Sequence, residues 1–157
     1  MKNTPLTARN RLCGITAPRV EQQWQVNHMT TVTIPIGCEP DIAQASRQAG
    51  QVAAQAGFSK LDSYYVATAA SELAANVFVH GGGGLLALRL LEERPGIELV
   101  ASDTGPGIAD IALAMQEGYS STGSLGCGLP GVQRLMDELW IDTTVGMGTR
   151  VRACKWR

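Results

Sequence analysis

Glu72 and Asn76 lie four residues apart in a segment with helical periodicity, so they share one face of the predicted helix. Thr68 and His80 extend this polar stripe along a helix otherwise rich in Ala, Leu and Val. The carboxylate could orient a hydroxyl nucleophile while the amide oxygen ligates Mg²⁺, which prefers hard oxygen ligands and keeps waters and phosphates around it. The alternative is the solvated face of an ordinary helix.

A second candidate is the run Asp103-Thr104-Gly105-Pro106-Gly107, which follows an apolar segment predicted to be a strand. A carboxylate at the end of a strand can accept a hydrogen bond from an exocyclic amine such as that of adenine. A charge-assisted bond of this kind contributes about 1.5–3 kcal/mol. Gly105 and Gly107 let the backbone turn sharply beside it. The alternative is an ordinary Asp-Thr-Gly turn.

A third candidate is the run Gly126-Cys127-Gly128-Leu129-Pro130-Gly131, which has the G-x-G-x-x-G spacing of dinucleotide sites. No buried strand precedes it and no β-α-β unit surrounds it, which excludes a Rossmann site. The run leads into a helix that begins near Leu129, where backbone N–H groups and the helix dipole favour phosphate. The sequence G-x-x-x-x-G-K-[ST] of P-loop proteins occurs nowhere in the chain.

The fourth candidate is Gly146-Met147-Gly148-Thr149, at the turn of a predicted hairpin. A tight turn alone would explain the two glycines. The functional alternative is that Thr149 places its hydroxyl near a purine.

Composition limits the class of protein. The chain has 157 residues, enough for one domain, and a net charge of −1, which argues against nucleic acid or an anionic membrane as its main partner. The four cysteines are scattered, as in a protein of a reducing compartment, and no apolar run reaches the roughly 18 residues of a membrane span. We therefore expect a cytoplasmic protein.

Periodicity predicts the elements that must position these residues. We expect residues 1–28 to form a flexible extension and residues 29–157 to form one domain. The expected strands are 31–36, 85–91, 97–102, 140–145 and 149–154, and the expected helices are 39–57, 59–80, 109–117 and 129–139, with a mobile loop at 119–126. Adjacent strand pairs predict an α+β two-layer sandwich, with a mixed, mostly antiparallel sheet and helices on one face.

Taken together, the four segments resemble the motifs of the GHKL (Bergerat-fold) ATPase/kinase superfamily. Residues 72–76 resemble its N-box, and residues 103–107, 126–129 and 146–149 resemble its three glycine boxes, in the same order. The sequences of these motifs are most similar to those of the RsbT-type serine/threonine switch kinases of bacterial stress signalling. The resemblance covers about residues 30–154.

The resemblance implies a role for each matched residue. Asp103 would bind the adenine amine with help from Thr149, Asn76 would hold Mg²⁺, and Glu72 would be the catalytic base or orienting group. The nucleotide would also contact the backbone of the glycine boxes, at Gly105, Gly107, Gly126, Gly128 and Leu129. Residues 118–127 would form a lid over ATP. Phosphate sites commonly include a Lys or Arg side chain, but residues 95–130, which contain this lid, have none. Arg134 is the nearest candidate cation for the phosphates.

The resemblance implies an ATP- and Mg²⁺-dependent protein-serine/threonine kinase of a partner-switching stress-response pathway. It would phosphorylate a STAS-domain antagonist and activate a PP2C-type phosphatase. One alternative is an anti-sigma factor kinase that sequesters a sigma factor, and another is a mainly non-catalytic, ATP-gated binding module. Eukaryotic-type kinases are excluded because the H-R-D and D-F-G signatures are absent. A sensor histidine kinase is disfavoured because His28 and His80 lie in no helical dimerisation segment.

Overall fold

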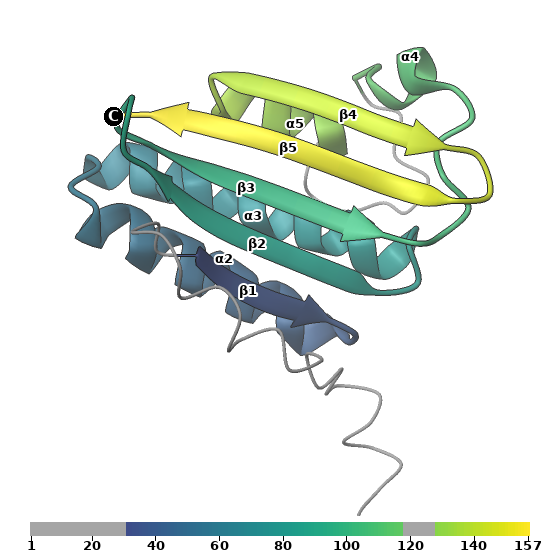
Figure 1. The fold of residues 1–157 in the computed structure, drawn as a ribbon, viewed down its shortest axis with the longest axis horizontal. Coiled ribbons are helices and arrows are strands. Elements are labelled where there is room, and N and C mark those ends of the chain that lie inside the picture. Colours follow the sequence, from purple (N-terminus) through teal and green to yellow (C-terminus); the bar gives the residue numbers. More distant parts are fainter. Residues whose placement is uncertain (1–30, 118–127) are drawn as a thin grey trace, which may run out of the picture.

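The computed structural model describes residues 31–117 and 128–157, which form an α+β fold with one sheet and helices packed on one of its faces (Figure 1). The elements are β1 (Thr31–Ile36), α2 (Glu39–Gln55), α3 (Lys60–Val79), β2 (Gly84–Leu91), β3 (Gly96–Asp103), α4 (Ile111–Ala114), α5 (Gly128–Leu135), β4 (Glu138–Thr144) and β5 (Gly148–Trp156). The predicted extension at 1–28 and the predicted loop at 119–126 lie outside the described residues. The predicted fold class is confirmed.

The sheet has five strands in the order β1-β2-β3-β5-β4, and each neighbouring pair is antiparallel. Two of these pairs, β2–β3 and β4–β5, are hairpins, and a short turn can join only antiparallel strands. The parallel pairing that a mixed sheet would require does not occur among the described strands. Strand β5 pairs with β3 as well as with β4, so the last hairpin is placed beside the end of β3 (Figure 1).

The core lies between the sheet and the helices. Strand residues alternate, so that Leu86, Leu88, Leu99 and Val151 point inward and are buried. Helix α3 covers the middle of the sheet, and α2 and α5 pack on either side of it. Alanines on α2 allow it to approach α3 closely, and a Cβ on Gly50 would come within 3.2 Å of the Ala67 Cβ.

The capping residues fix where α2 and α3 begin. The Asp41 carboxylate accepts hydrogen bonds from the backbone N–H groups of Gly37 and Cys38, at 2.8 and 2.9 Å, before the first turn of α2. Ser59 caps α3 by accepting a bond from the N–H of Asp62.

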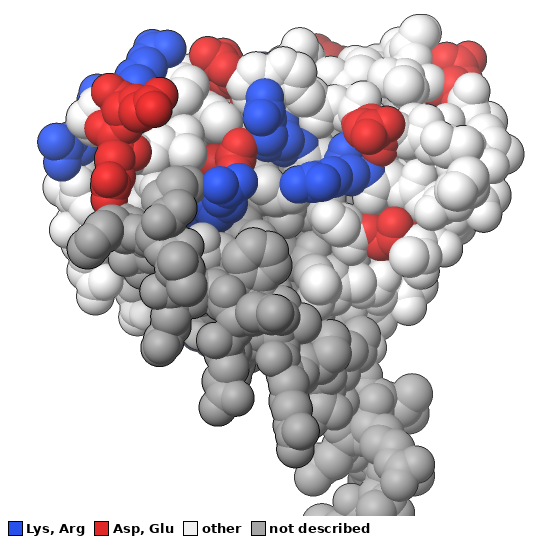
Figure 2. All heavy atoms as spheres, viewed as in Figure 1, with Lys and Arg blue, Asp and Glu red and all other residues white. Residues whose placement is uncertain are grey.

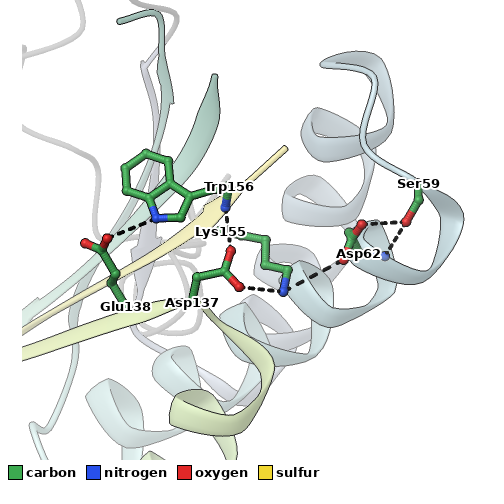
Figure 3. A network of polar contacts seen from close by, with 6 residues as sticks. All are labelled: Ser59, Asp62, Asp137, Glu138, Lys155 and Trp156. Atoms are coloured by element: carbon green, nitrogen blue, oxygen red, sulfur yellow. Dashed lines mark hydrogen bonds and ion pairs between the residues drawn. The ribbon is translucent and has the colours of Figure 1, made fainter. Parts of the chain in front are cut away.

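Lys155 ties the start of α3 to the end of the sheet (Figure 3). Its side chain is only 13 % exposed, and its ammonium group lies 3.8 Å from the Asp62 carboxylate and 3.1 Å from that of Asp137. Asp137 also accepts a bond from the backbone N–H of Trp156. The orientation of α3, which carries Glu72 and Asn76, is therefore coupled to β5.

Two predicted helices are longer than the observed ones. The helix predicted at 129–139 ends at Leu135, because Asp137 binds the end of β5 and residues 138–144 form β4. Leu139 has helical spacing from Leu135, but it packs into the core as an inward strand residue. The helix predicted at 109–117 is a single turn that begins when Asp110 accepts a bond from the N–H of Leu113. Within the described ranges, no helix has the length and apolarity needed to cross a membrane.

Candidate functional site

Glu72 and Asn76 lie on α3 beside the positions that face the sheet. Val66, Ala70, Leu73 and Val77 are buried against the sheet. Glu72 and Asn76 lie on other positions of the helix and are half-buried. The stripe is therefore not a fully solvated helix face, since part of each of these side chains is covered by neighbouring structure.

Glu72 lies against the start of α5. Burial raises the pKa of its carboxyl above the ordinary value, while a hydrogen bond from the backbone of Gly128 acts in the opposite direction. Gly128 has a positive φ of 57°, and no atom would obstruct a Cβ there. The backbone conformation therefore favours glycine at the position where this N–H meets the carboxylate.

The Asp103 carboxylate lies where β3 ends. Its Oδ1 accepts a hydrogen bond from the N–H of Gly105 at 2.9 Å, which orients the group. Asp103 is paired with Thr149 of β5 on one side and with Gly84 of β2 on the other. Within the described part of the chain, no hydrogen bond is formed by Oδ2, so that oxygen could accept one from a ligand.

Thr149 belongs to a hydroxyl network behind Asp103. Its Oγ1 lies 3.0 Å from that of Thr143, which accepts a bond from the N–H of Ile108 and donates to the Gly148 carbonyl. Thr143 has one hydroxyl proton for two partners, so when it gives this proton to Gly148, Thr149 donates to Thr143. In that arrangement the Thr149 oxygen can still accept a hydrogen bond from a ligand.

Three glycine segments meet around Asp103 at distances that no side chain would allow. A Cβ on Gly81 would lie 2.4 Å from the Asp103 Cβ, and one on Gly148 would lie 2.1 Å from the Asp103 carbonyl oxygen. A Cβ on Gly105 would lie 2.8 Å from the Gly81 Cα, and one on Gly107 would lie 2.5 Å from the carbonyl oxygen of Thr144. The segment after α3, the end of β3 and the β4–β5 turn therefore form one close-packed corner.

The structure joins the predicted residues into two neighbouring groups. The corner at the end of β3 contains Asp103, Gly105, Gly107 and Thr149. The second group lies between α3 and the start of α5, where the Glu72 carboxylate meets the backbone of Gly128. The backbone carbonyl of Asn76 accepts bonds from the N–H groups of His80 and Gly81, and Gly81 packs against Asp103, so the end of α3 is fixed beside this corner. Within residues 31–117 and 128–157, no hydrogen bond joins the Glu72 carboxylate to that of Asp103.

Two residues of the predicted nucleotide site, Gly126 and Leu129, do not present side chains to it in the described structure. Gly126 and the whole of the proposed lid at 118–127 lie outside the described residues. Leu129 has its side chain buried in the core, so only its backbone could reach a nucleotide.

Sequence reasoning gave no role to Gly81 and did not consider Thr143. Gly81 opens a run of four glycines directly after α3, and this run was the signal that backbone approaches closely there. Thr143 has no such signal, because a threonine in a strand is ordinary.

The donor set suits a hard cation shared with phosphates better than a protein-only metal centre. Asn76 offers an amide oxygen one turn from the Glu72 carboxylate. In the described ranges, His, Cys, Asp and Glu form no cluster of three or more that could hold a metal. Mg²⁺ is commonly bound in this way, through one or two protein oxygens and the substrate phosphates.

Comparison with known proteins decides the family. Residues 37–155 match the model of the histidine kinase-like ATPase domain. The chain belongs to this family. It is 41 % identical over 125 residues to the serine/threonine-protein kinase RsbT of Bacillus subtilis (strain 168), an alignment that covers 78 % of this chain and 94 % of that protein. The predicted resemblance to the GHKL superfamily is thus confirmed, and an ATP-binding domain is what this family provides.

Anti-sigma factors are also similar to this chain. It is 33 % identical over 97 residues to the anti-sigma F factor of Thermoanaerobacter sp. (strain X514), covering 58 % of this chain and 68 % of that protein. The anti-sigma F factor of Clostridium novyi (strain NT) is 33 % identical over 93 residues, covering 55 % and 65 %. The identity and coverage are both higher for RsbT.

Proposed function

We propose that this protein is an ATP- and Mg²⁺-dependent protein-serine/threonine kinase of a partner-switching pathway. The observation that supports the proposal is the close packing of Gly81, which follows the helix of Glu72 and Asn76, against Asp103 at the end of β3, in a histidine kinase-like ATPase domain. The 41 % identity to a protein named as a serine/threonine kinase supports the reaction class.

Adenine recognition falls to the corner at the end of β3. Asp103 Oδ2 accepts a hydrogen bond from the exocyclic amine, while the Gly105 N–H holds Oδ1 and keeps the carboxylate oriented. Thr149 contributes its hydroxyl beside the ring. The glycines of this corner leave the backbone close enough for a flat ligand to be enclosed.

Glu72 orients and deprotonates the acceptor hydroxyl. For this it must be ionised, and the Gly128 N–H favours the ionised form. Asn76 holds Mg²⁺, which when bound neutralises charge on the phosphates. Such a site needs little covalent chemistry from the protein, since phosphoryl transfer depends mainly on positioning and electrostatics.

For partners, we propose a STAS-domain protein as the substrate and a PP2C-type phosphatase as a second binding partner. The greater identity and coverage of the RsbT match favour this over a sigma factor as the partner. Sequestration of a sigma factor remains the second candidate, because anti-sigma F factors match more than half of the chain.

The test is transfer from labelled Mg·ATP to a STAS-domain protein encoded near this one. Glu72→Ala should bind ATP but lose transfer, whereas Asp103→Asn should lose ATP binding. Undiminished transfer by Glu72→Ala would overturn its role as base. Absence of ATP binding by the unaltered protein at millimolar Mg²⁺ would overturn the whole proposal.

A further inference from the structure

A hollow lies at the end of the domain where β2 stops and α2 ends. It has a volume of about 350 Å³, and most of the residues that line it are apolar, namely Ala56, Phe58, Leu90, Leu91 and Pro95. Leu90 and Leu91 are the last two residues of β2, and both are only partly buried. None of the described residues fills this space between the end of α2 and the β2–β3 turn.

Strand β1 begins beside this hollow. Its first residue, Thr31, pairs with Arg89, so β2 runs two residues further, and Leu90 and Leu91 have no partner in the described part of β1. Figure 1 shows the start of β1 at the same end of the sheet as the β2–β3 turn and the C-terminus. The chain that precedes Thr31 therefore enters the fold next to the lining of the hollow.

The charges around the hollow are balanced. Glu92 and Glu93 of the β2–β3 turn are exposed, and Figure 2 shows acidic side chains gathered with basic ones at the left end of the molecule, where this turn lies in Figure 1. The basic side chains of this end already have partners. Arg94 lies 3.8 Å from the Glu138 carboxylate, and Arg157 donates to the carbonyl of the α2 C-cap residue at 2.7 Å. The hollow therefore suits an occupant that is apolar and carries no charge.

The segment directly before β1 has this character. Residues 22–30 contain no Lys, Arg, Asp or Glu, and they include the apolar residues Trp24, Val26 and Met29. Trp24 and Val26 stand at even positions, as do Ile34 and Ile36, the residues by which β1 is buried against the helices. Alternation of this kind predicts an extended segment with its apolar side chains on one face.

We propose that the hollow is the docking site of residues 24–30 of the same chain, with the side chains of Trp24 and Val26 seated among its apolar residues. The indole supplies a large apolar surface, and burying such a ring is among the most favourable single contacts that a side chain can make. The segment is tethered at β1, so its effective concentration at the hollow is in the millimolar range. It therefore occupies the hollow ahead of a free peptide or a second copy with the same sequence.

The tether is long enough for this arrangement. Trp24 precedes Thr31 by seven residues and Val26 precedes it by five, which span up to about 23 Å and about 17 Å at roughly 3.3 Å per residue. The hollow extends to Gly96 at the start of β3. That position is two strands from β1, about 10 Å at the usual spacing between strands. Both side chains can reach it, even if the segment bends around the end of β2.

The hollow and the candidate site are at opposite ends of the sheet. Gly84 at one end of β2 pairs with Asp103, whereas Leu91 at the other end pairs with Gly96. Seven residues separate these positions on β2, about 24 Å at roughly 3.4 Å per residue. Docking of the segment therefore leaves the nucleotide site open, and the inference does not depend on the proposed function.

The proposal can be tested with the full chain labelled with 5-fluorotryptophan, in which Trp24, Trp140 and Trp156 each give one ¹⁹F NMR signal. The signal of residue 24 is the one lost in Trp24→Phe. We expect it to lie away from its position in urea, and to move toward that position in Leu91→Glu, which places a charge in the hollow. Leu85→Glu is the matched control, because Leu85 is 37 % exposed at the other end of the same strand. An unchanged Trp140 signal shows that each variant is folded.

A second pair of variants leaves the described domain unaltered. Trp24→Ala should shift the methyl signals of Leu90 and Leu91. Gln25→Ala, one position along and on the opposite face of the extended segment, should leave them in place. Trp24→Ala should also bind Mg·ATP as tightly as the unaltered protein, so a failed docking assay and a failed kinase assay are separable.

Several results would overturn the docking of this segment. One is a residue 24 signal that already lies at its urea position in the unaltered protein, and another is equal shifts in Trp24→Ala and Gln25→Ala. A residue 24 signal that stays in place in a folded Leu91→Glu would also exclude the hollow as its site. A signal that moves on dilution would show that the segment comes from a second copy of the chain, which would overturn docking within one chain.

Discussion

Gly81 lies against Asp103 so closely that a Cβ at residue 81 would come within 2.4 Å of the Asp103 Cβ and 2.5 Å of its carboxyl carbon. The same added atom would lie 2.6 Å from the Val77 carbonyl oxygen, so it could not be accommodated by moving one flexible side chain. The first residue after the α3 cap is therefore part of the packing that positions the candidate adenine-binding carboxylate.

Gly81→Ala should displace Asp103 and weaken ATP binding. We expect at least a tenfold loss of ATP affinity and a loss of about 1–3 kcal/mol in the free energy of unfolding, typical of overpacking. Isothermal titration with Mg·ATP and urea unfolding would measure the two effects. Gly82→Asn is the matched control, because Gly82 has a φ of 73° that Asn tolerates and nothing lies within 4 Å of its added Cβ. An unchanged ATP affinity in Gly81→Ala would contradict this packing role.

Glu72 should make stability depend on pH. Burial raises the pKa of its carboxyl in the folded state above the ordinary value of 4.5, despite the Gly128 hydrogen bond. The folded protein therefore favours the protonated group, and the contribution to stability is complete below pH 4.5 and is lost as pH rises through the folded-state pKa. Glu72→Gln, which stays neutral, should raise the Tm at pH 7 and leave it little changed near pH 4.

The same variant separates stability from catalysis. If Glu72 is the base, Glu72→Gln should lower transfer about 10²–10⁴-fold at pH 7 even though it is the more stable protein. In the unaltered enzyme, kcat/KM should fall as pH is lowered through the raised pKa of Glu72. A transfer rate independent of pH across that range would show that the ionised carboxylate is not needed.

Most helices and strands could be predicted because their apolar residues recur with a regular period and a capping or turn residue marks one end. Alternation marks β1, and Ser59 marks the start of α3. The order of the strands could not be predicted, because periodicity tells which face of a strand is buried and not which strand lies beside it. The position of β5 between β3 and β4 is what brings Thr149 beside Asp103, so the site depends on the part of the topology that the pattern leaves open.

The end of the last helix shows a second limit. Leu135, Met136 and Leu139 have helical spacing, but Leu139 also suits the inward side of a strand. Tertiary contacts decide between the two, since Asp137 binds the N–H of Trp156 and directs the chain into β4. Short apolar runs remain ambiguous for this reason.

The β4–β5 turn should tolerate a methyl group at one glycine and not at another. Gly148 has a φ of 112°, and its added Cβ would lie 2.1 Å from the Asp103 carbonyl oxygen. Gly146 has a φ of 79° but no atom within 4 Å of such a Cβ. We expect Gly146→Ala to cost about 1 kcal/mol for the left-handed conformation alone. Gly148→Ala should cost about 1–3 kcal/mol more because of overpacking, and should also weaken ATP binding. Similar losses in both variants, measured by chemical unfolding, would contradict the close approach.

The Thr143 hydroxyl should stabilise the corner from behind Asp103. Thr143→Val keeps the shape of the side chain but leaves the Ile108 N–H without its acceptor and the Thr149 hydroxyl without its hydrogen-bond partner. We expect a loss of about 1–3 kcal/mol in the free energy of unfolding, the usual cost of a polar group left unpaired. Thr143→Ser should recover most of it, since a serine hydroxyl can make the same bonds. Because Thr149 would lose the group that orients it, ATP affinity should fall in Thr143→Val and return in Thr143→Ser. A Thr143→Val protein as stable as the original would show that these hydroxyl bonds contribute nothing net to the fold.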